Sequence, residues 1–281
     1  MLIKLIGGAR RLALSAAWLV AGLSPLFTAQ AQVASAPLKP STQSYHPWQA
    51  PPPNGAAQAY FVNINDGDKI ETPFVAKFGL SGGWGLAPIS APISGKSGHH
   101  HLLVNRDLPL DFKQPLPFNE QYIHFGKGQM ETVLNLAPGQ YALRLLLADD
   151  KHLPHFVYSK PVRVTVVKKN PVDPATLVTK GLSLLVSAEA VRAPIRVQFH
   201  ASGFNVGHLA QKQKDTGHFR LTVTPQGKGK APEAVMDFVN GQTEVWLAPP
   251  PSDYELKLEL VDNASPERTL ANAATATVKV K

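Results

Sequence analysis

The sequence predicts an all-β chain. Beyond residue 58, apolar and polar residues alternate over short runs, and Gly, Pro, Asn and Asp separate these runs. Alternation with a period of two is typical of strands that bury one face, and no long run follows the period of a helix. Tyr141 and Tyr254 each follow a turn at the start of such a run. A tyrosine in this position is typical of the corner between the two sheets of immunoglobulin-like domains, so we expect two tandem immunoglobulin-like β-sandwich domains.

Four blocks of sequence occur twice, in the same order and at similar spacing. They are residues 72–78 and 193–199, 97–104 and 216–223, 125–129 and 238–242, and 141–149 and 254–262. A shared order of this kind indicates a tandem duplication. Each position in one repeat therefore predicts the orientation of its counterpart in the other.

The first 31 residues have the composition of an export signal peptide. A positively charged start precedes an apolar stretch, and Ala29-Gln30-Ala31 is a small-x-small cleavage site. The apolar stretch is short and interrupted for a transmembrane anchor, and no second span follows it. We expect an exported, periplasmic protein that begins at Gln32 and has no membrane span after signal cleavage.

Proline-rich stretches divide the mature chain. Residues 32–58 have little apolar periodicity and are predicted to be a Pro-rich linker, solvated in preference to docked through its aromatic pair Tyr45 and Trp48. A histidine-rich β-sandwich domain is expected over 59–168, and a second linker over 169–180. The second, degenerate repeat is expected over 181–281.

Charge and cysteine content exclude several classes of protein. The signal contains three basic and no acidic residues, so its removal lowers the formal charge from +8 to +5. Neither half carries the dense Lys/Arg stripe that phosphate contacts require, so no nucleic-acid partner is expected. The chain has no cysteine, which excludes disulfides, thiolate ligands and thiol nucleophiles. Each repeat must therefore be stabilised by its own apolar core.

Histidines are concentrated in the first repeat. Six of the ten lie between residues 99 and 155, in the segments Gly98-His99-His100-His101, Ile123-His124-Phe125 and His152-Leu153-Pro154-His155. Imidazole is the commonest protein ligand for zinc and copper, and it titrates near neutral pH. This part of the chain is where we expect any chemistry to be located.

The second repeat predicts which of these rings share a face. The apolar residues within 219–223 alternate as core-facing positions, so His100 should point inward, with His99 and His101 together on the outer face. The same reasoning turns His124 outward, where it can join them if the two strands are neighbours.

His152 and His155 follow the next strand in a loop, a natural element to close a site over a sheet face. The second repeat has Arg220 and Asp237 in place of His101 and His124. The candidate metal ligands are His99, His101, His124, His152 and His155.

All-nitrogen ligation suits Zn(II) or Cu(II). No HExxH or C-x-x-C signature is present, and structural roles remain open. His100 is consistent with a hydrogen-bonded core histidine. His99 recurs as His218 in the repeat that lacks the other rings, which is consistent with a structural hydrogen bond. A metal-free hydrogen-bond network or a pH-sensitive surface are the alternatives to a metal site.

The motifs Gly98-His99-His100-His101-Leu102-Leu103 and Ile123-His124-Phe125-Gly126-Lys127-Gly128-Gln129, with His152-Leu153-Pro154-His155, resemble an uncharacterised family of exported bacterial domains of unknown function. The resemblance covers about residues 58–168. It implies an exported domain with these boundaries and no established activity. The second repeat departs from the family's pattern at nearly every histidine.

Three functions are compatible with these observations. The first is a non-catalytic periplasmic protein that binds a divalent metal ion through the first domain. The second is a metal-free structural or interaction module with a protein partner in the cell envelope. The third is a metal-assisted hydrolase or redox enzyme with Glu120, Glu131, Asp149 or Asp150 as base. We expect no enzyme, because none of these carboxylates stands at a motif-defined spacing from the histidines.

Overall fold

Strands make up nearly all the regular structure of this protein. The computed structural model describes residues 39, 42–53, 55–227 and 232–281. Within them one short 3₁₀ turn, η1 (Pro174–Thr176), lies between the two repeats. The predicted signal peptide, residues 1–31, lies outside the described residues. No helix among the described residues is long and apolar enough to cross a membrane.

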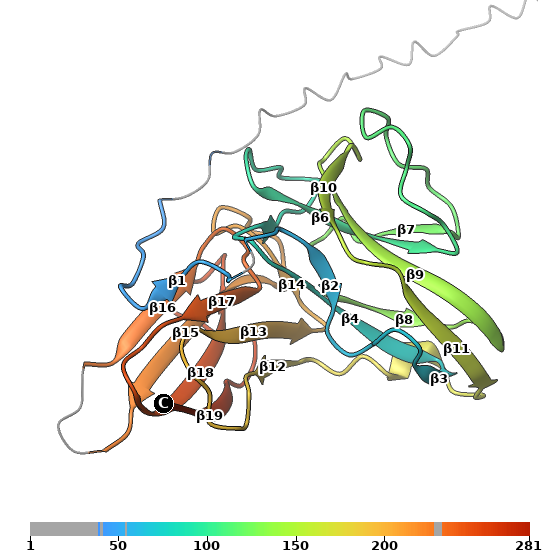
Figure 1. Cartoon of the computed structure of the whole chain (residues 1–281). Helices are drawn as coiled ribbons and strands as arrows, with labels where there is room; N and C mark the ends of the chain where they lie inside the picture. Colours follow the sequence, from blue (N-terminus) through green and yellow to red (C-terminus); the bar gives the residue numbers. More distant parts are fainter. Residues whose placement is uncertain (1–38, 40–41, 54, 228–231) are drawn as a thin grey trace, which may run out of the picture. The chain divides into compact units, whose positions relative to one another are not determined.

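The amino-terminal repeat is a sandwich of two antiparallel-rich sheets (blue to yellow-green in Figure 1). Its strands are β2 (Ala59–Phe61), β3 (Lys69–Thr72), β4 (Phe74–Leu80), β5 (Gly85–Leu86), β6 (Ser97–Val104), β7 (Tyr122–His124), β8 (Glu131–Leu134), β9 (Gly139–Ala148), β10 (Pro154–Tyr158) and β11 (Val162–Lys169). One sheet has the order β2-β4-β8. The other has the order β3-β11-β9-β6-β5, with β7 paired to β6 and β10 paired to β9.

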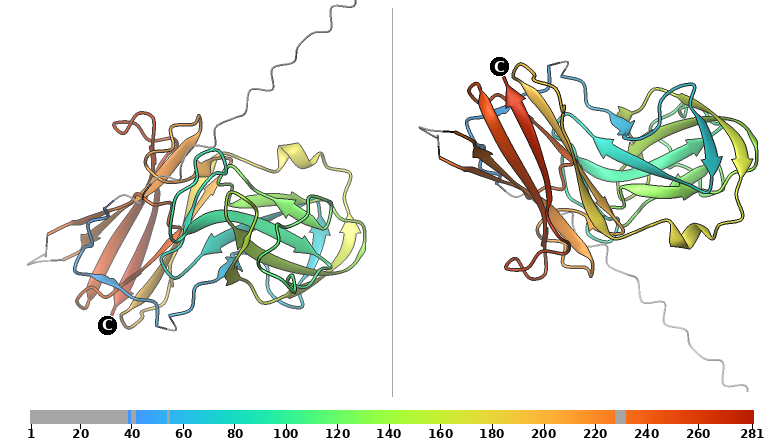
Figure 2. Two further views of the ribbon diagram at one scale, coloured as in Figure 1. Left: turned by 90° about the horizontal axis from the view of Figure 1, so that it is seen from above. Right: turned by 90° about the horizontal axis from the view of Figure 1, so that it is seen from below.

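The carboxy-terminal repeat has the same arrangement (dark yellow to red in Figures 1 and 2). Its strands are β12 (Gly181–Leu185), β13 (Ile195–Ser202), β14 (Asn205–Val206), β15 (Thr216–Pro225), β16 (Ala234–Phe238), β17 (Glu244–Leu247), β18 (Ser252–Asp262) and β19 (Ala274–Val280). One sheet contains β17-β13-β12, and the other has the order β14-β15-β18-β19 with β16 paired to β15. The predicted pair of tandem immunoglobulin-like sandwiches is confirmed.

Both predicted tyrosine corners are present. The Tyr141 hydroxyl donates to the carbonyl of Ala137 at 3.0 Å. The Tyr254 hydroxyl donates to the carbonyl of Pro250 at 2.7 Å. In each repeat the ring therefore fixes the turn that precedes the long central strand, β9 or β18.

Equivalent aromatic groups fill the centres of the two sandwiches. In the second repeat the ring of Phe199 packs against Phe219 and Phe238, with centroids 5.3 and 4.8 Å away. In the first repeat Phe78 packs against His100 and Phe125, at 5.5 and 5.1 Å. The positions correspond one to one in the repeated blocks, so a histidine in the first repeat occupies the place of a core phenylalanine.

The segment predicted to be a solvated linker is docked over part of its length, so that interpretation was wrong there. A two-residue strand, β1 (Gln49–Ala50), pairs with the edge of β17. The Trp48 ring packs edge-on against Tyr254, with centroids 5.7 Å apart. Strand β17 offers unpaired backbone groups at its edge, and burial of the indole adds apolar contact there. Proline content alone did not reveal this anchor.

Candidate metal centre

Adjacent antiparallel strands hold three of the predicted ligands. Strand β6 pairs with β7 in a register that places His101 directly opposite His124. His99 lies two residues earlier on β6 and therefore on the same face. The condition for convergence, that the two strands be neighbours, is met. Gly126 leaves room for the His124 ring, because a Cβ at that position would lie 3.0 Å from the ring's Cε1.

The fourth ring comes from the turn between β9 and β10. The Asp149 carboxylate accepts hydrogen bonds from the backbone N–H groups of Lys151 and Leu153, at 2.9 and 2.8 Å. His152 lies inside this turn with a φ of 63°. Left-handed backbone is uncommon for a residue with a side chain, and such conformations cluster at functional sites. The turn places the His152 ring over the sheet, where it contacts the rings of β6 and β7.

These four imidazoles form a compact group. One nitrogen from each of His99, His101, His124 and His152 lies within 4.8 Å of the other three. The Nε2 atoms of His99 and His101 are 2.9 Å apart. A tetrahedral zinc site with Zn–N bonds of 2.0–2.1 Å requires nitrogens roughly 3.3 Å apart. The nitrogens of the group, within 4.8 Å of one another, lie near that spacing.

The face that carries the group is covered rather than exposed. His99 and His101 do point away from the main core, as predicted, but both are fully buried. A second apolar cluster lies over this face, built from Leu103, Leu116, Leu146 and Ala148. The sequence argument treated an outward-pointing residue as a solvated one. The segment 105–121 between β6 and β7 folds over the sheet, and its apolar residues were the signal for this.

Burial keeps the rings neutral. Together with a smaller contribution from neighbouring imidazoles, it lowers the pKa of His99 to about 3 and that of His101 to about 2. Burial also lowers the pKa of His124 and His152, while Asp149 and Asp150 partly oppose this at His152. A neutral imidazole has a free lone pair, which is the form that binds a metal ion.

The fifth predicted ligand, His155, is not part of this group. Its ring packs against Trp84 with centroids 4.8 Å apart, and its Nε2 is buried without a hydrogen-bond partner among the described residues. His100 differs from its prediction in another way. It points into the core as expected, but neither ring nitrogen has a hydrogen-bond partner in the described part of the chain. Its surroundings are those of a phenylalanine.

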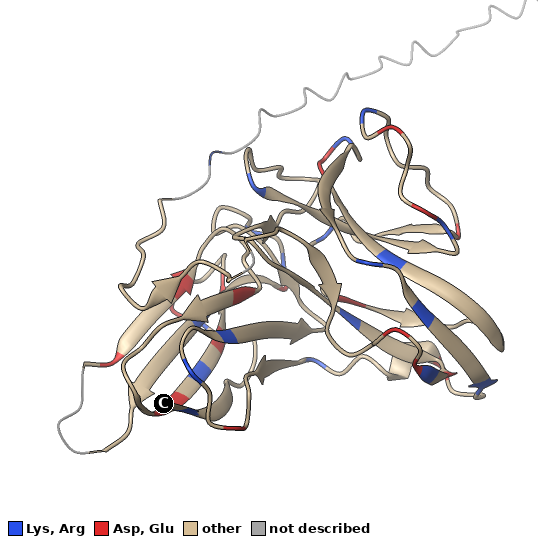
Figure 3. Cartoon of the chain, viewed as in Figure 1, with Lys and Arg blue, Asp and Glu red and all other residues tan. Residues whose placement is uncertain are grey.

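Two of the carboxylates considered as catalytic bases have other roles. Glu131 accepts hydrogen bonds from His200 Nε2 at 3.1 Å, Ser202 Oγ at 2.8 Å and the Gly203 N–H at 2.9 Å. Asp149 shapes the His152 turn. The Glu131–His200 pair is buried and joins residues far apart in the sequence, so local spacing could not reveal it. Acidic and basic residues are interspersed over both repeats (Figure 3).

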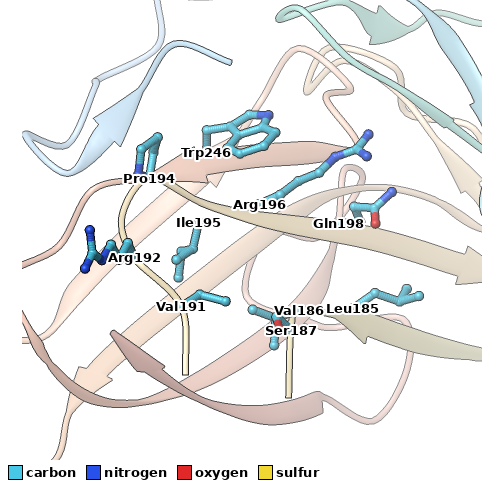
Figure 4. A pocket seen from close by; sticks show the side chains of 10 residues that line it. All are labelled: Leu185, Val186, Ser187, Val191, Arg192, Pro194, Ile195, Arg196, Gln198 and Trp246. Carbon is cyan, nitrogen blue, oxygen red and sulfur yellow. The ribbon is translucent and has the colours of Figure 1, made fainter. Parts of the chain in front are cut away.

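A groove on the second repeat is separate from the histidine group (Figure 4). Trp246, Arg196 and Gln198 line it together with residues of the 185–194 segment. Of its two arginines, Arg192 and Arg196, the second is already engaged, because it binds Glu244 at 2.6 Å and lies over the Tyr60 ring at 4.4 Å. No residue of the groove is a metal-ligand candidate, and we assign no ligand to it.

Comparison with known protein families identifies one family whose model matches this chain. The model of the family described as "Domain of unknown function (DUF4399)" matches residues 76–167 and 197–281. The chain belongs to this family, and the two matches fall on the two repeats. The resemblance drawn from the histidine motifs is confirmed, and so is the presence of a second copy. No curated protein matches the sequence.

Several solved structures are similar to this chain at low identity. The fibronectin(III)-like modules of Clostridium thermocellum CbhA are 10% identical over 80% of this chain and 94% of that chain, with a TM-score of 0.22. Chicken CNTN1 FN1–FN3 domains are 9% identical over 77% and 66%, with a TM-score of 0.22. Beta-glucuronidase 3 of Bacteroides uniformis is 10% identical over 79% and 25%, with a TM-score of 0.23. Structural similarity at these TM-scores does not support an inference about function.

Proposed function

We propose that this is an exported, non-catalytic protein whose first domain binds one divalent metal ion, Zn(II) or Cu(II), through His99, His101, His124 and His152. The observation that carries the proposal is the convergence of four imidazole nitrogens, from two strands and a turn, within 4.8 Å of one another. Three nitrogen ligands on rigid strands and one on a constrained turn form a site that needs little rearrangement to bind an ion.

The electrostatic state of the group supports this proposal. Four neutral rings offer lone pairs without a bound proton to displace at neutral pH. Burying several polar rings that have few hydrogen-bond partners is costly, at roughly 1–3 kcal/mol for each unsatisfied group. A bound cation offsets part of that cost, because one nitrogen of each ring then has a partner.

The surroundings favour binding over catalysis. A catalytic metal site needs an open coordination position and a base within hydrogen-bond reach of the reacting group. Glu131 is held by three donors at a different place, and Asp149 Oδ1 accepts from two backbone N–H groups of its own turn. We infer a protein that holds or carries the ion.

Titration of the mature, tag-free protein with Zn(II) and Cu(II) by calorimetry tests the proposal. We expect about one ion per chain, and a His99→Ala/His101→Ala/His124→Ala variant should bind at least about 100-fold more weakly. His46→Ala is the matched control, since it removes an imidazole that bonds only within residues 46–49. Equal and weak uptake by the wild type and the triple variant would overturn the proposal.

A metal-free interaction module is the second candidate, and exposed aromatic rings favour it. Phe112 and Phe156 stack in parallel with centroids 4.4 Å apart, and Phe156 is 76% exposed. Exposed aromatic residues are common at protein interfaces. For this candidate we expect the melting temperature to be the same with chelator and with added metal, whereas an ion bound by the folded chain raises it.

A further inference from the structure

A phenylalanine covers the solvent side of the histidine group. The ring of Phe118 meets His124 and His152 edge to face, with centroids 4.7 and 4.5 Å away. These two histidines are the half-buried members of the group, whereas His99 and His101 are fully buried. Phe118 itself is 60% exposed. The ring thus lies between the least buried ligands and the solvent.

The segment that carries Phe118 is fixed on both sides of it. The N–H of Leu116 donates to the carbonyl of His152 at 2.9 Å, and the Leu116 side chain is buried. On the other side, Asn119 forms a turn in which its carbonyl accepts from the Tyr122 N–H at 3.0 Å. The position of the ring is therefore set by backbone hydrogen bonds and not only by its own packing.

Hydrogen bonds do not orient the ligands from behind. A metal-binding histidine usually donates its second ring N–H to a carboxylate or a carbonyl group, which fixes the ring. In the described residues, the Nδ1 atoms of His99, His101 and His124 and the Nε2 of His152 have no hydrogen-bond partner. Contacts between rings must hold the two half-buried ligands in place, and Phe118 supplies such a contact to both.

We propose that Phe118 closes the coordination sphere, so that the ion is held by four nitrogens with no bound water and exchanges slowly. This inference rests on the proposed metal site. It adds what controls the exchange of the ion and which ions the site selects. A closed four-nitrogen sphere suits tetrahedral ions such as Zn(II), while ions that take a tetragonal or higher geometry need room for further ligands. Phe118 is thus a positioning and specificity-determining residue, which acts through His124 and His152.

Cobalt(II) is the probe for this proposal, because its visible absorption is intense in four-coordinate tetrahedral sites and weak when water adds as a further ligand. We expect the mature wild-type protein to give the tetrahedral spectrum. Phe118→Ala should bind Co(II) with several-fold weaker absorption. It should also release Zn(II) to a chelator about tenfold faster, as expected when a group that orients metal ligands is removed.

Two further variants make the test specific. Phe118→Tyr keeps the ring and should behave as the wild type. Phe156→Ala removes another exposed phenylalanine, whose stacking partner is Phe112 and not a histidine of the group, and should also leave spectrum and release rate unchanged. The melting temperature of each variant is measured to confirm that it folds.

The outcomes separate the two proposals. Identical spectra and release rates for the wild type and Phe118→Ala would overturn the role of Phe118 and leave the metal site intact. No cobalt or zinc uptake by the wild type would overturn the metal site itself. A change in Phe118→Ala that Phe156→Ala shares would show a general effect of lost aromatic surface, and would also overturn the role of Phe118.

Discussion

The two repeats place different chemistry at the same strand positions. In the second repeat Arg220 and Asp237 are direct partners across β15 and β16, as His101 and His124 are across β6 and β7. Arg220 Nε donates to Asp237 Oδ1 at 2.7 Å, and the His218 and Arg220 side chains hold the pKa of Asp237 at about 2. One repeat has a closed ion pair where the other has neutral rings.

The difference shows that the fold alone does not require these histidines. His218, the counterpart of His99, shares a hydrogen bond with Asn263 Oδ1 at 2.7 Å, so it has a structural partner. His99 has only another imidazole nitrogen as partner among the described residues. The same backbone therefore carries a self-satisfied polar network in one copy and a set of imidazoles with few hydrogen-bond partners in the other. The first arrangement suits stability, and the second suits binding.

Replacing His101 and His124 with the residues of the second repeat is the change with the largest expected effect on this comparison. His101→Arg with His124→Asp gives the first repeat the ion pair of the second, and we expect metal affinity to fall by about 100-fold or more because two of four ligands are lost. The fold should persist, since the second repeat accommodates the pair in the same register. Calorimetric titration with Zn(II) measures the effect.

A second double variant controls for the possibility that the exchange variant misfolds. His101→Gln with His124→Gln introduces no charge and should lose affinity to a similar extent. Wild-type affinity in a folded exchange variant would mean that these two rings are not ligands.

The pH dependence of stability should differ between the wild type and the exchange variant. The buried rings of His99, His100 and His101 have pKa values of about 3, 3 and 2, below their usual 6.5. The unfolded chain therefore binds protons more readily, so the free energy of unfolding is largest above pH 6.5 and falls as the pH decreases below it. Between pH 7 and 5 the loss is about 2 kcal/mol for each histidine that stays neutral in the folded state.

Urea unfolding of the metal-free protein at pH 7, 6 and 5 measures this dependence. The exchange variant lacks two of the depressed imidazoles and should show a shallower decline. A wild-type stability that is flat over this range would contradict the assignment of neutral buried rings.

Glutamates at equivalent positions of β8 and β17 have different partners, although both side chains are buried. Glu131 is held by His200, Ser202 and Gly203, whereas Glu244 binds Arg196 and the Tyr60 hydroxyl. Glu131→Ala should lower the free energy of unfolding by about 2–3 kcal/mol, because it leaves buried donors without an acceptor. Metal affinity should not change.

Chemical denaturation and zinc titration of the Glu131 variant provide both readouts. Glu120→Ala, at an exposed position of the 105–121 segment, is the control and should unfold like the wild type. A loss of zinc binding in Glu131→Ala would connect this carboxylate to the metal site and would contradict the separation drawn above.

The local alternation of apolar and polar residues was enough to predict the strands and the face on which each histidine of β6 and β7 lies. The alternation in 216–223 predicted that His100 and its two neighbours point in opposite directions, and the repeated blocks predicted two sandwiches. What failed depended on contacts between distant segments. The covering of His99 and His101 by 105–121, the docking of Trp48 and the Glu131–His200 hydrogen bond all join residues whose proximity is set by tertiary packing.

Phe118 shows the limit most clearly. The apolar residues of the 105–121 segment do not reveal which rings Phe118 contacts, because His124 on β7 and His152 in the β9–β10 turn are brought to it only by tertiary packing. Four of the five histidines predicted from the sequence come together, whereas His155 packs against Trp84, because spacing within a loop does not determine which ring turns toward the sheet.

The smallest expected effect concerns His100, which occupies the place of a core phenylalanine. Its ring lies 5.5 Å from Phe78, as Phe219 lies 5.3 Å from Phe199 in the second repeat. Two buried nitrogens without a hydrogen-bond partner in the described chain are costly, so His100→Phe should raise the free energy of unfolding by about 1 kcal/mol after allowance for the larger ring. The mirror substitution, Phe219→His, should lower it. Urea unfolding at pH 7 measures both, and zinc affinity should stay at the wild-type value because His100 faces away from the other rings. A loss of zinc binding in His100→Phe would show that the two faces of β6 do not act independently.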